Sequence, residues 1–266
     1  MSFNPPSPPT FTNRPGRRTP SEPRWRVQRY SRPQSVPMNS KLTRRFEIEW
    51  WEDGEVKTQS RVAPALPVFE QAFGAFSHGI LIQTSEGPVA VEDLEPGMML
   101  ETPEGHHVRL IWKGAITLVP GAPSLSEIPD KLYRVMPDAF GLGRPTQDQT
   151  FGPHVRHMNR DPNIRAAMGA ECALVPLSNS VDGMSIIEVT PVAPTRVYHL
   201  ACERHETILA AGVEVETYHP GPDVALSLSE EMMRHFLMFF PYIGNIRDFG
   251  RLAAPRINAE DIDAFD

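Results

Sequence analysis

The sequence has little cysteine and no long apolar run. Its 266 residues include only Cys172 and Cys202, each within a short apolar stretch. Two cysteines exclude a disulfide framework and match no zinc-ligand spacing, so we interpret both as buried, unreactive thiols. The absence of 18 consecutive apolar residues argues against a transmembrane helix. The N-terminus also lacks an apolar segment of the signal-peptide type, so the cytoplasm is the default expectation for location.

Acidic residues are scarce at the start of the chain and abundant after it. Residues 1–45 hold 10 Lys and Arg against 1 Glu, a net charge of 10 − 1 = +9, and the remainder has 16 − 32 = −16. Proline and arginine dominate this first segment, which cannot bury enough apolar surface to offset its ordering entropy. We expect residues 1–45 to be a disordered basic arm, either a solubilising tail or a weak electrostatic contact for nucleic acid or an anionic membrane.

Residues 46–74 have the pattern of a β-hairpin followed by a lead-in segment. Apolar residues alternate with glutamate in "FEIEW" (residues 46–50), and the dipeptide Asp53-Gly54 is a strong turn signal. The stretch 66–76, "LPVFEQAFGAF", predicts one short helix that leads into the next strand.

Short apolar segments separated by turn residues continue from 79 to about 218. This pattern predicts a mainly β fold, with one helix over residues 159–169. Residues 223–266 predict a helical C-terminal extension, whose helix begins after the N-cap Ser229 and ends at Pro241. Its apolar face, which we expect to pack against the β-domain, consists of Met232, Met233, Phe236, Leu237 and Phe240.

Three segments resemble, in the right order, the bacterial-type Hint (Hedgehog/intein) domain family. Residues 76–114, "FSHGILIQTSEGPVAVEDLEPGMMLETPEGHHVRLIWKG", resemble the family's opening half, with its "TxxG" turn and "VEDLxPG". Residues 139–158, "AFGLGRPTQDQTFGPHVRHM", are similar to the family segment that ends in "SPxHR", and residues 197–221 resemble its closing segment. The resemblance spans residues 75–222 and implies a mainly β, horseshoe-like Hint fold.

The resemblance also implies a chemistry that this chain has lost in part. Hint domains cleave their own backbone: a Cys or Ser at the first position attacks the preceding carbonyl carbon, and a His polarises the amide. Ala75 occupies that first position, and the hydroxyl and histidine of "SPxHR" read Gly152 and Val155. The terminal His-Asn pair of inteins reads Glu216-Thr217. We therefore interpret the chain as a Hint-fold protein without self-cleaving activity, a binding or structural module for an unidentified protein partner.

The alternative is residual self-cleavage by other side chains. Ser77 faces the same side as Ala75 in an extended chain and would attack the carbonyl of Phe76, with His205 as the remaining histidine. His154 lies one position from the lost histidine, and within a strand it would point to the opposite face unless a bulge intervenes.

Other residues give weaker signals. The loop "FGLGRP" lacks the third glycine of a dinucleotide loop, and the adjacent carboxylates Glu92 and Asp93 fall in a predicted turn. The histidines that invite a metal-site interpretation match no ligand spacing; they are His78, His106, His107, His154 and His157. We expect neither a metal nor a cofactor.

Overall fold

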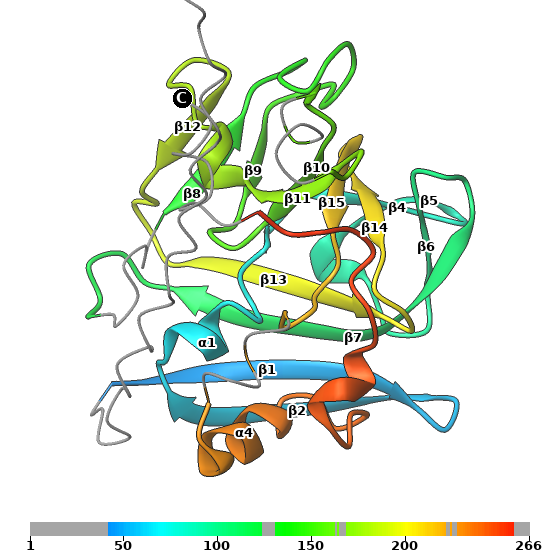
Figure 1. Cartoon of the computed structure of the whole chain (residues 1–266). Helices are drawn as coiled ribbons and strands as arrows, with labels where there is room; N and C mark the ends of the chain where they lie inside the picture. The colour runs from blue at the N-terminus through cyan, green and yellow to red at the C-terminus, as the bar shows by residue number, and fades with distance from the viewer. Residues whose placement is uncertain are drawn as a thin grey trace, which may run out of the picture. The chain divides into compact units, whose positions relative to one another are not determined.

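A computed structural model describes residues 42–123, 131–162, 164, 169–221, 224 and 228–257 (Figure 1). Strands dominate this part of the chain and join into one 15-stranded network of antiparallel ladders. They are β1 (Thr43–Glu52), β2 (Glu55–Pro64), β3 (Phe76–Ser77), β4 (Leu81–Thr84), β5 (Gly87–Ala90), β6 (Met99–Glu101), β7 (His107–Leu118), β8 (Leu132–Val135), β9 (Gln149–Phe151), β10 (Arg156–Asn159), β11 (Ala173–Pro176), β12 (Ile186–Val189), β13 (Thr195–Cys202), β14 (Thr207–Ala210) and β15 (Val213–Glu216). The predicted mainly β fold is confirmed.

Helices are few and short in the same residues. α1 (Pro67–Glu70) lies in the lead-in segment, and α4 (Glu230–Leu237) is the C-terminal helix. Short 3-10 helices occupy turns; they are η1 (Val91–Asp93), η2 (Leu177–Ser180) and η3 (Ile246–Phe249). No helix in the described ranges has both the length and the apolar character that crossing a membrane requires.

Three predicted segments lie partly outside the described residues: the basic arm, the helix over residues 159–169 and the C-terminal extension over residues 223–266. Residues 1–41 of the predicted arm are among those not described, but Thr43–Arg45 already belong to β1. They pair with Val62–Pro64 of β2, so the hairpin begins three residues before the predicted boundary. Part of the helix predicted over residues 159–169, namely residues 163 and 165–168, is likewise not described, and Asn159 is the last residue of β10 rather than helical.

The hairpin of β1 and β2 joins the edge of the Hint-like region. Its turn is the predicted Asp53-Gly54, and both residues adopt positive φ, 52° and 85°. β1 then pairs with β7 over four residues, from Glu47 opposite Ala115 to Trp50 opposite Trp112. Figure 1 shows β2, β1, β7 and β13 side by side in that order. The segment that precedes the Hint-like region is therefore part of the same sheet.

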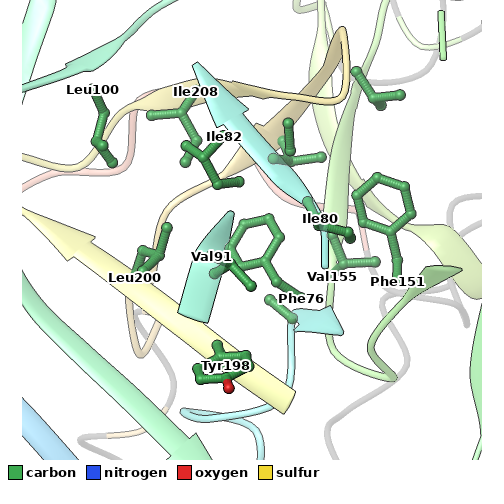
Figure 2. Close-up of a cluster of buried hydrophobic side chains, with 14 of the residues drawn as sticks. Phe76, Ile80, Ile82, Val91, Leu100, Phe151, Val155, Tyr198, Leu200 and Ile208 are labelled. Carbon is green, nitrogen blue, oxygen red and sulfur yellow. The ribbon is translucent and has the colours of Figure 1, made fainter. Parts of the chain in front are cut away.

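Two hydrophobic cores hold these strands together. The first lies between the strands of the Hint-like region, and its labelled side chains, including Phe76, Ile80, Val91 and Val155, point toward one another in Figure 2. The second lies on the other side, where α4 and the hairpin meet β7; its largest members are Phe46, Phe69, Phe73, Trp112, Phe236, Phe239 and Phe240.

A single hydrogen bond helps to fix the C-terminal helix on the second core. The indole Nε1 of buried Trp112 donates to the carbonyl oxygen of Phe239 at 2.8 Å. As predicted, Ser229 is the N-cap of α4, and its hydroxyl accepts from the Met232 amide at 3.2 Å. The predicted end of the helix is wrong, because α4 ends at Leu237, before Pro241. The chain turns there so that Phe239 and Phe240 enter the core.

The "VEDL" segment (residues 91–94) connects β7 to the loop after β3 through hydrogen bonds. It forms η1, and the buried Lys113 of β7 donates to the carbonyl oxygens of Glu92 (3.0 Å) and Leu94 (2.5 Å). The Glu92 carboxylate accepts from the amide of Gly79 at 2.9 Å and pairs with His78 at 3.2 Å. Glu92 therefore fixes the loop that follows β3.

Candidate functional site

The candidate site is the peptide bond between Gly74 and Ala75, where the resemblance places cleavage. The Ala75 amide donates to the carbonyl oxygen of Tyr198 in β13, and the Ala75 carbonyl accepts from the amide of Gly152, both at 2.8 Å. The Gly74 carbonyl accepts from the amide of His154, also at 2.8 Å. Strand pairing on both sides thus holds this peptide bond in place, and the methyl group of Ala75 is fully buried in the first core.

Gly152 allows this close packing. A Cβ atom built on Gly152 would lie 2.8 Å from the carbonyl carbon of Gly74 and 3.0 Å from that of Ala75, with the Gly74 oxygen closer still. Real Cβ atoms do not approach backbone atoms this closely, so glycine alone fits here without a shift of the main chain. The position that the resemblance assigns to a hydroxyl side chain has no room for one.

His154 and Val155, two and three positions after Gly152, differ in what they contribute. Val155 is 1 % exposed and packs in the first core, where its side chain offers no polar atom. His154 belongs to the turn between β9 and β10, so the face alternation expected within a strand does not apply to it. Its ring lies beside the cleavage position, with Cδ2 at 2.9 Å from a Cβ built on Gly74. Burial, with the charge of Arg156, lowers the pKa of His154 to about 4.

A second imidazole near the site was not identified from the sequence. His199 follows Tyr198 in β13, and its Nδ1 donates to the carbonyl oxygen of Gln71 at 3.2 Å. Its ring meets that of Phe76 edge-on, and burial lowers its pKa to about 3. A histidine inside the apolar strand "VYHLA" is the one sequence signal that marks it. Both imidazoles are therefore neutral at physiological pH.

Ser77 and His205, the alternative catalytic pair, have separate partners. The buried Ser77 hydroxyl donates to the carbonyl oxygen of Thr150. Nδ1 of His205 accepts from the amide of Ala253 at 2.8 Å, and Nε2 lies 3.1 Å from the carbonyl oxygen of Thr217 and 3.0 Å from the Glu216 carboxylate. Hydrogen bonds to other groups therefore occupy the Ser77 hydroxyl and both ring nitrogens of His205.

The segment in the place of the inteins' terminal pair is buried. Glu216 is 4 % exposed and Thr217 is fully buried. The Thr217 hydroxyl donates to the carbonyl oxygen of Glu206 at 2.9 Å and accepts from the Glu206 amide at 3.2 Å. These contacts attach the end of β15 to the loop before β14.

The remaining candidate residues do not assemble a ligand cluster. Within the described residues, no group of three or more His, Cys, Asp or Glu side chains has a geometry that holds a metal ion. His106 instead lies 3.6 Å from Glu206, and His157 meets the Ser180 hydroxyl at 2.8 Å. Cys202 is buried, which raises the pKa of its thiol well above its usual range.

Comparisons with known proteins agree with the sequence resemblance. A crystal structure of the gp41-1 intein is 11 % identical, with a TM-score of 0.33, over 55 % of this chain and 98 % of that one. The solution structure of a bacterial intein-like domain from Clostridium thermocellum is 13 % identical, with a TM-score of 0.35, over 55 % and 99 %. No curated protein matches. The family model of the Hint domain matches residues 74–222, and the chain therefore belongs to the Hint domain family.

Proposed function

We propose that this Hint-family protein does not cleave its own backbone and serves as a binding or structural module. The observation that carries the proposal is the buried methyl group of Ala75 at the first position of the domain. A methyl group has no lone pair, so it forms neither an ester nor a thioester with the Gly74 carbonyl carbon.

The surroundings of the peptide bond support the same conclusion. The amide of His154 donates to the Gly74 oxygen, which polarises the carbonyl as an oxyanion donor would. Polarisation without an attacking atom leaves the peptide bond intact. The packing at Gly152 adds a second obstacle, because a side chain that could assist the reaction has no space there.

A role as a module is supported by the flanking segments. The hairpin of β1 and β2 and the helix α4 share the second core with β7, through buried Phe46, Trp112 and Phe239. Burial of this much aromatic surface makes a rigid unit, which is the property that a scaffold for a protein partner requires. We expect the partner to be a protein that binds the outer surface of this unit, and capture on the immobilised full chain is the way to identify it.

The proposal is tested by incubating the purified full chain with dithiothreitol or hydroxylamine near neutral pH. Dithiothreitol attacks the acyl carbon of a thioester, and hydroxylamine attacks that of a thioester or an ester. Either reaction expels the thiol or alcohol and so separates the chain into two fragments. We expect a single species of 29.8 kDa throughout. A Hint domain that carries its nucleophilic cysteine, treated in parallel, provides the positive control. Time-dependent fragments with an end between residues 74 and 77 would contradict the proposal.

The alternative with Ser77 and His205 makes a different prediction. If the chain is inactive, Ser77→Ala leaves backbone integrity unchanged and lowers the free energy of unfolding by about 1–2 kcal/mol, because the half-buried Thr150 carbonyl loses its donor. Urea unfolding and intact mass measure the two effects. Ser60→Ala, on the exposed face of β2, is the control and should change neither. Fragments that appear in the wild type and vanish in Ser77→Ala would establish the alternative.

The charge asymmetry favours a second, weaker activity. We propose that the part of the basic arm before β1, residues 1–41, contacts polyanions such as nucleic acid or an anionic membrane, because its net charge of 8 − 1 = +7 stands against 18 − 32 = −14 in the rest of the chain. Binding to heparin, measured as a general polyanion probe, should weaken by at least about tenfold between 50 and 200 mM salt. Deletion of residues 1–41 should abolish it. Heparin binding that persists both at 200 mM salt and after the deletion would rule out the arm as the binding element.

A further inference from the structure

Residues Gly250–Ile257 lie beyond the part of the chain that the family model matches, yet they pack on its last strands. In Figure 1 this red segment runs from η3 across β15 toward β11. The amide of Leu174 in β11 donates to the carbonyl oxygen of Pro255 at 2.7 Å, and the amide of Ile257 donates back to Leu174 at 3.1 Å. This ladder step is parallel and isolated. We call Gly250–Ile257 the strap.

The side chain of Ile257 anchors the end of the strap in a small core. Ile257 is 1 % exposed and packs with Ile164, Ala173 and Val175. Its carbonyl oxygen accepts from a guanidinium nitrogen of Arg156 at 2.9 Å. A backbone bridge to an edge strand and one apolar anchor are features of a peptide held by strand addition.

Arg256 is the charged anchor of the strap. Its guanidinium donates to the carboxylate of buried Glu216 at 2.8 Å and to the carbonyl oxygen of His219 at 2.7 Å. A Cβ on Gly221 would lie 2.8 Å from the same guanidinium, so glycine makes room for it. Burial alone would raise the pKa of Glu216, but the hydrogen bond from His205 and the charge of Arg256 lower it. The pocket therefore presents an ionised carboxylate, a carbonyl oxygen and a glycine to one arginine.

The strap also covers the late histidine of the domain. The Ala253 amide of the strap donates to Nδ1 of His205 and so occupies that nitrogen. Nε2 in turn faces Thr217 and Glu216. The imidazole has no free nitrogen as long as the strap is in place.

We propose that the last strands of this Hint domain form a binding site for an extended, arginine-bearing peptide, and that the chain fills this site with its own strap. The arginine is recognised by Glu216 and the His219 carbonyl, the peptide backbone by Leu174, and the apolar end by the core around Val175. The inference deepens the proposed role as a binding module. It is tested by exchange and peptide binding rather than by cleavage, so the two proposals can fail separately.

The test uses the full chain with Arg256→Met, which removes the anchor while keeping the length of the side chain. Because the buried Glu216 carboxylate loses the partner that ties the strap to it, hydrogen exchange at the amides of Ala253, Leu174 and Ile257 should accelerate about 100-fold or more. Amides in the ladder of β1 and β2 should keep their rates. Arg251→Met is the matched control, since Arg251 lies exposed on the same strap, and it should leave all rates unchanged.

A synthetic peptide with the sequence of the strap, GRLAAPRI, is then added to the Arg256→Met chain at about 1 mM. It should bind and slow exchange at the Leu174 amide again. The tethered strap of the variant binds weakly, and its effective concentration at the site is comparable to that of the added peptide, so the peptide can replace it. The same peptide with methionine in place of the arginine that corresponds to Arg256 should neither bind nor slow exchange. Equal effects of both peptides, or equal rates in Arg256→Met and Arg251→Met, would overturn the proposal. If Arg256→Met accelerates exchange throughout the chain, the wild-type protein provides the test instead. In the wild type, the amides of Ala253, Leu174 and Ile257 should exchange at one common rate that is faster than the rate of amides in the β7–β13 ladder. Exchange of these three amides at the same rate as the β7–β13 ladder would contradict the inference.

Discussion

Replacing Gly152 with serine should destabilise the protein by about 3 kcal/mol, although serine is the residue type that the family resemblance expects there. The Cβ atom of a serine would lie 2.8 Å from the carbonyl carbon of Gly74 and closer to its oxygen. Those atoms are main chain and hydrogen-bonded on both sides, so they cannot move aside as the end of a flexible side chain would. The backbone around Ala75 must shift, and the first core with it.

The measurement is urea unfolding followed by tryptophan fluorescence. Gly244→Ser is the control, because a Cβ at Gly244 meets nothing closer than 3.5 Å, and it should change the free energy of unfolding by no more than about 0.5 kcal/mol. If Gly152→Ser proved as stable as Gly244→Ser, the site would have room for a hydroxyl and the account of a closed site would be wrong. The expected loss means that the family residue at this position cannot be restored by one substitution.

Acidification should destabilise the protein strongly between pH 6.5 and pH 4. Burial, the largest cause in each case, lowers the pKa of four histidines from 6.5: to about 4 in His154, His157 and His219, and to about 3 in His199. Above pH 6.5 these rings are neutral in both states. As the pH falls below 6.5, these histidines bind protons in the unfolded chain but stay neutral in the folded chain. The free energy of unfolding therefore decreases progressively until the pH reaches the pKa values of the folded state. Each ring contributes on the order of 3 kcal/mol, a large fraction of a typical total stability.

Urea unfolding at a series of pH values measures this loss. The slope of the free energy of unfolding against pH should fall by up to about 1.4 kcal/mol per pH unit in His199→Gln, which has one fewer buried imidazole to protonate. His235→Gln, on the exposed side of α4, should leave the slope unchanged. A free energy of unfolding that stays constant from pH 6.5 to pH 4.5 would mean that water reaches these rings.

Local patterns in the sequence predicted the local structure well. The strict alternation in "FEIEW" and the turn signal Asp53-Gly54 predicted the hairpin, and Ser229 predicted the start of α4. Both features depend on residues that are neighbours in the sequence. The end of α4 could not be predicted from Pro241, because burial of Phe239 and Phe240 turns the chain earlier. Tertiary contacts decided that boundary.

The site could be predicted only in part for the same reason. The motif order placed Ala75, Gly152 and Val155, and all three lie within the residues that the family model matches. The expectation for His154 assumed a strand, whereas the residue lies in a turn, so its ring reaches Gly74 without a bulge. His199 approaches the site through pairing of β13 with β3, which joins residues more than 100 positions apart and leaves no local signal.

The pairing of the hairpin with β7 and the docking of the strap were also beyond local patterns. The contact of Trp50 with Trp112 spans the domain boundary that composition indicates. The contact of Arg256 with Glu216 depends on a buried carboxylate 40 positions away. From composition alone, the hairpin and the strap are predicted to be extensions of the domain. In the structure, both segments pack against it.

The most direct measurement is the intact mass of freshly expressed protein without a purification tag, because it shows whether the backbone remains whole after synthesis and folding. The account predicts one species at the mass of the full chain, 29.8 kDa, with the Gly74–Ala75 bond unbroken. A pair of fragments that divide the chain between residues 74 and 77, and whose masses sum to the full chain plus one water, would contradict it.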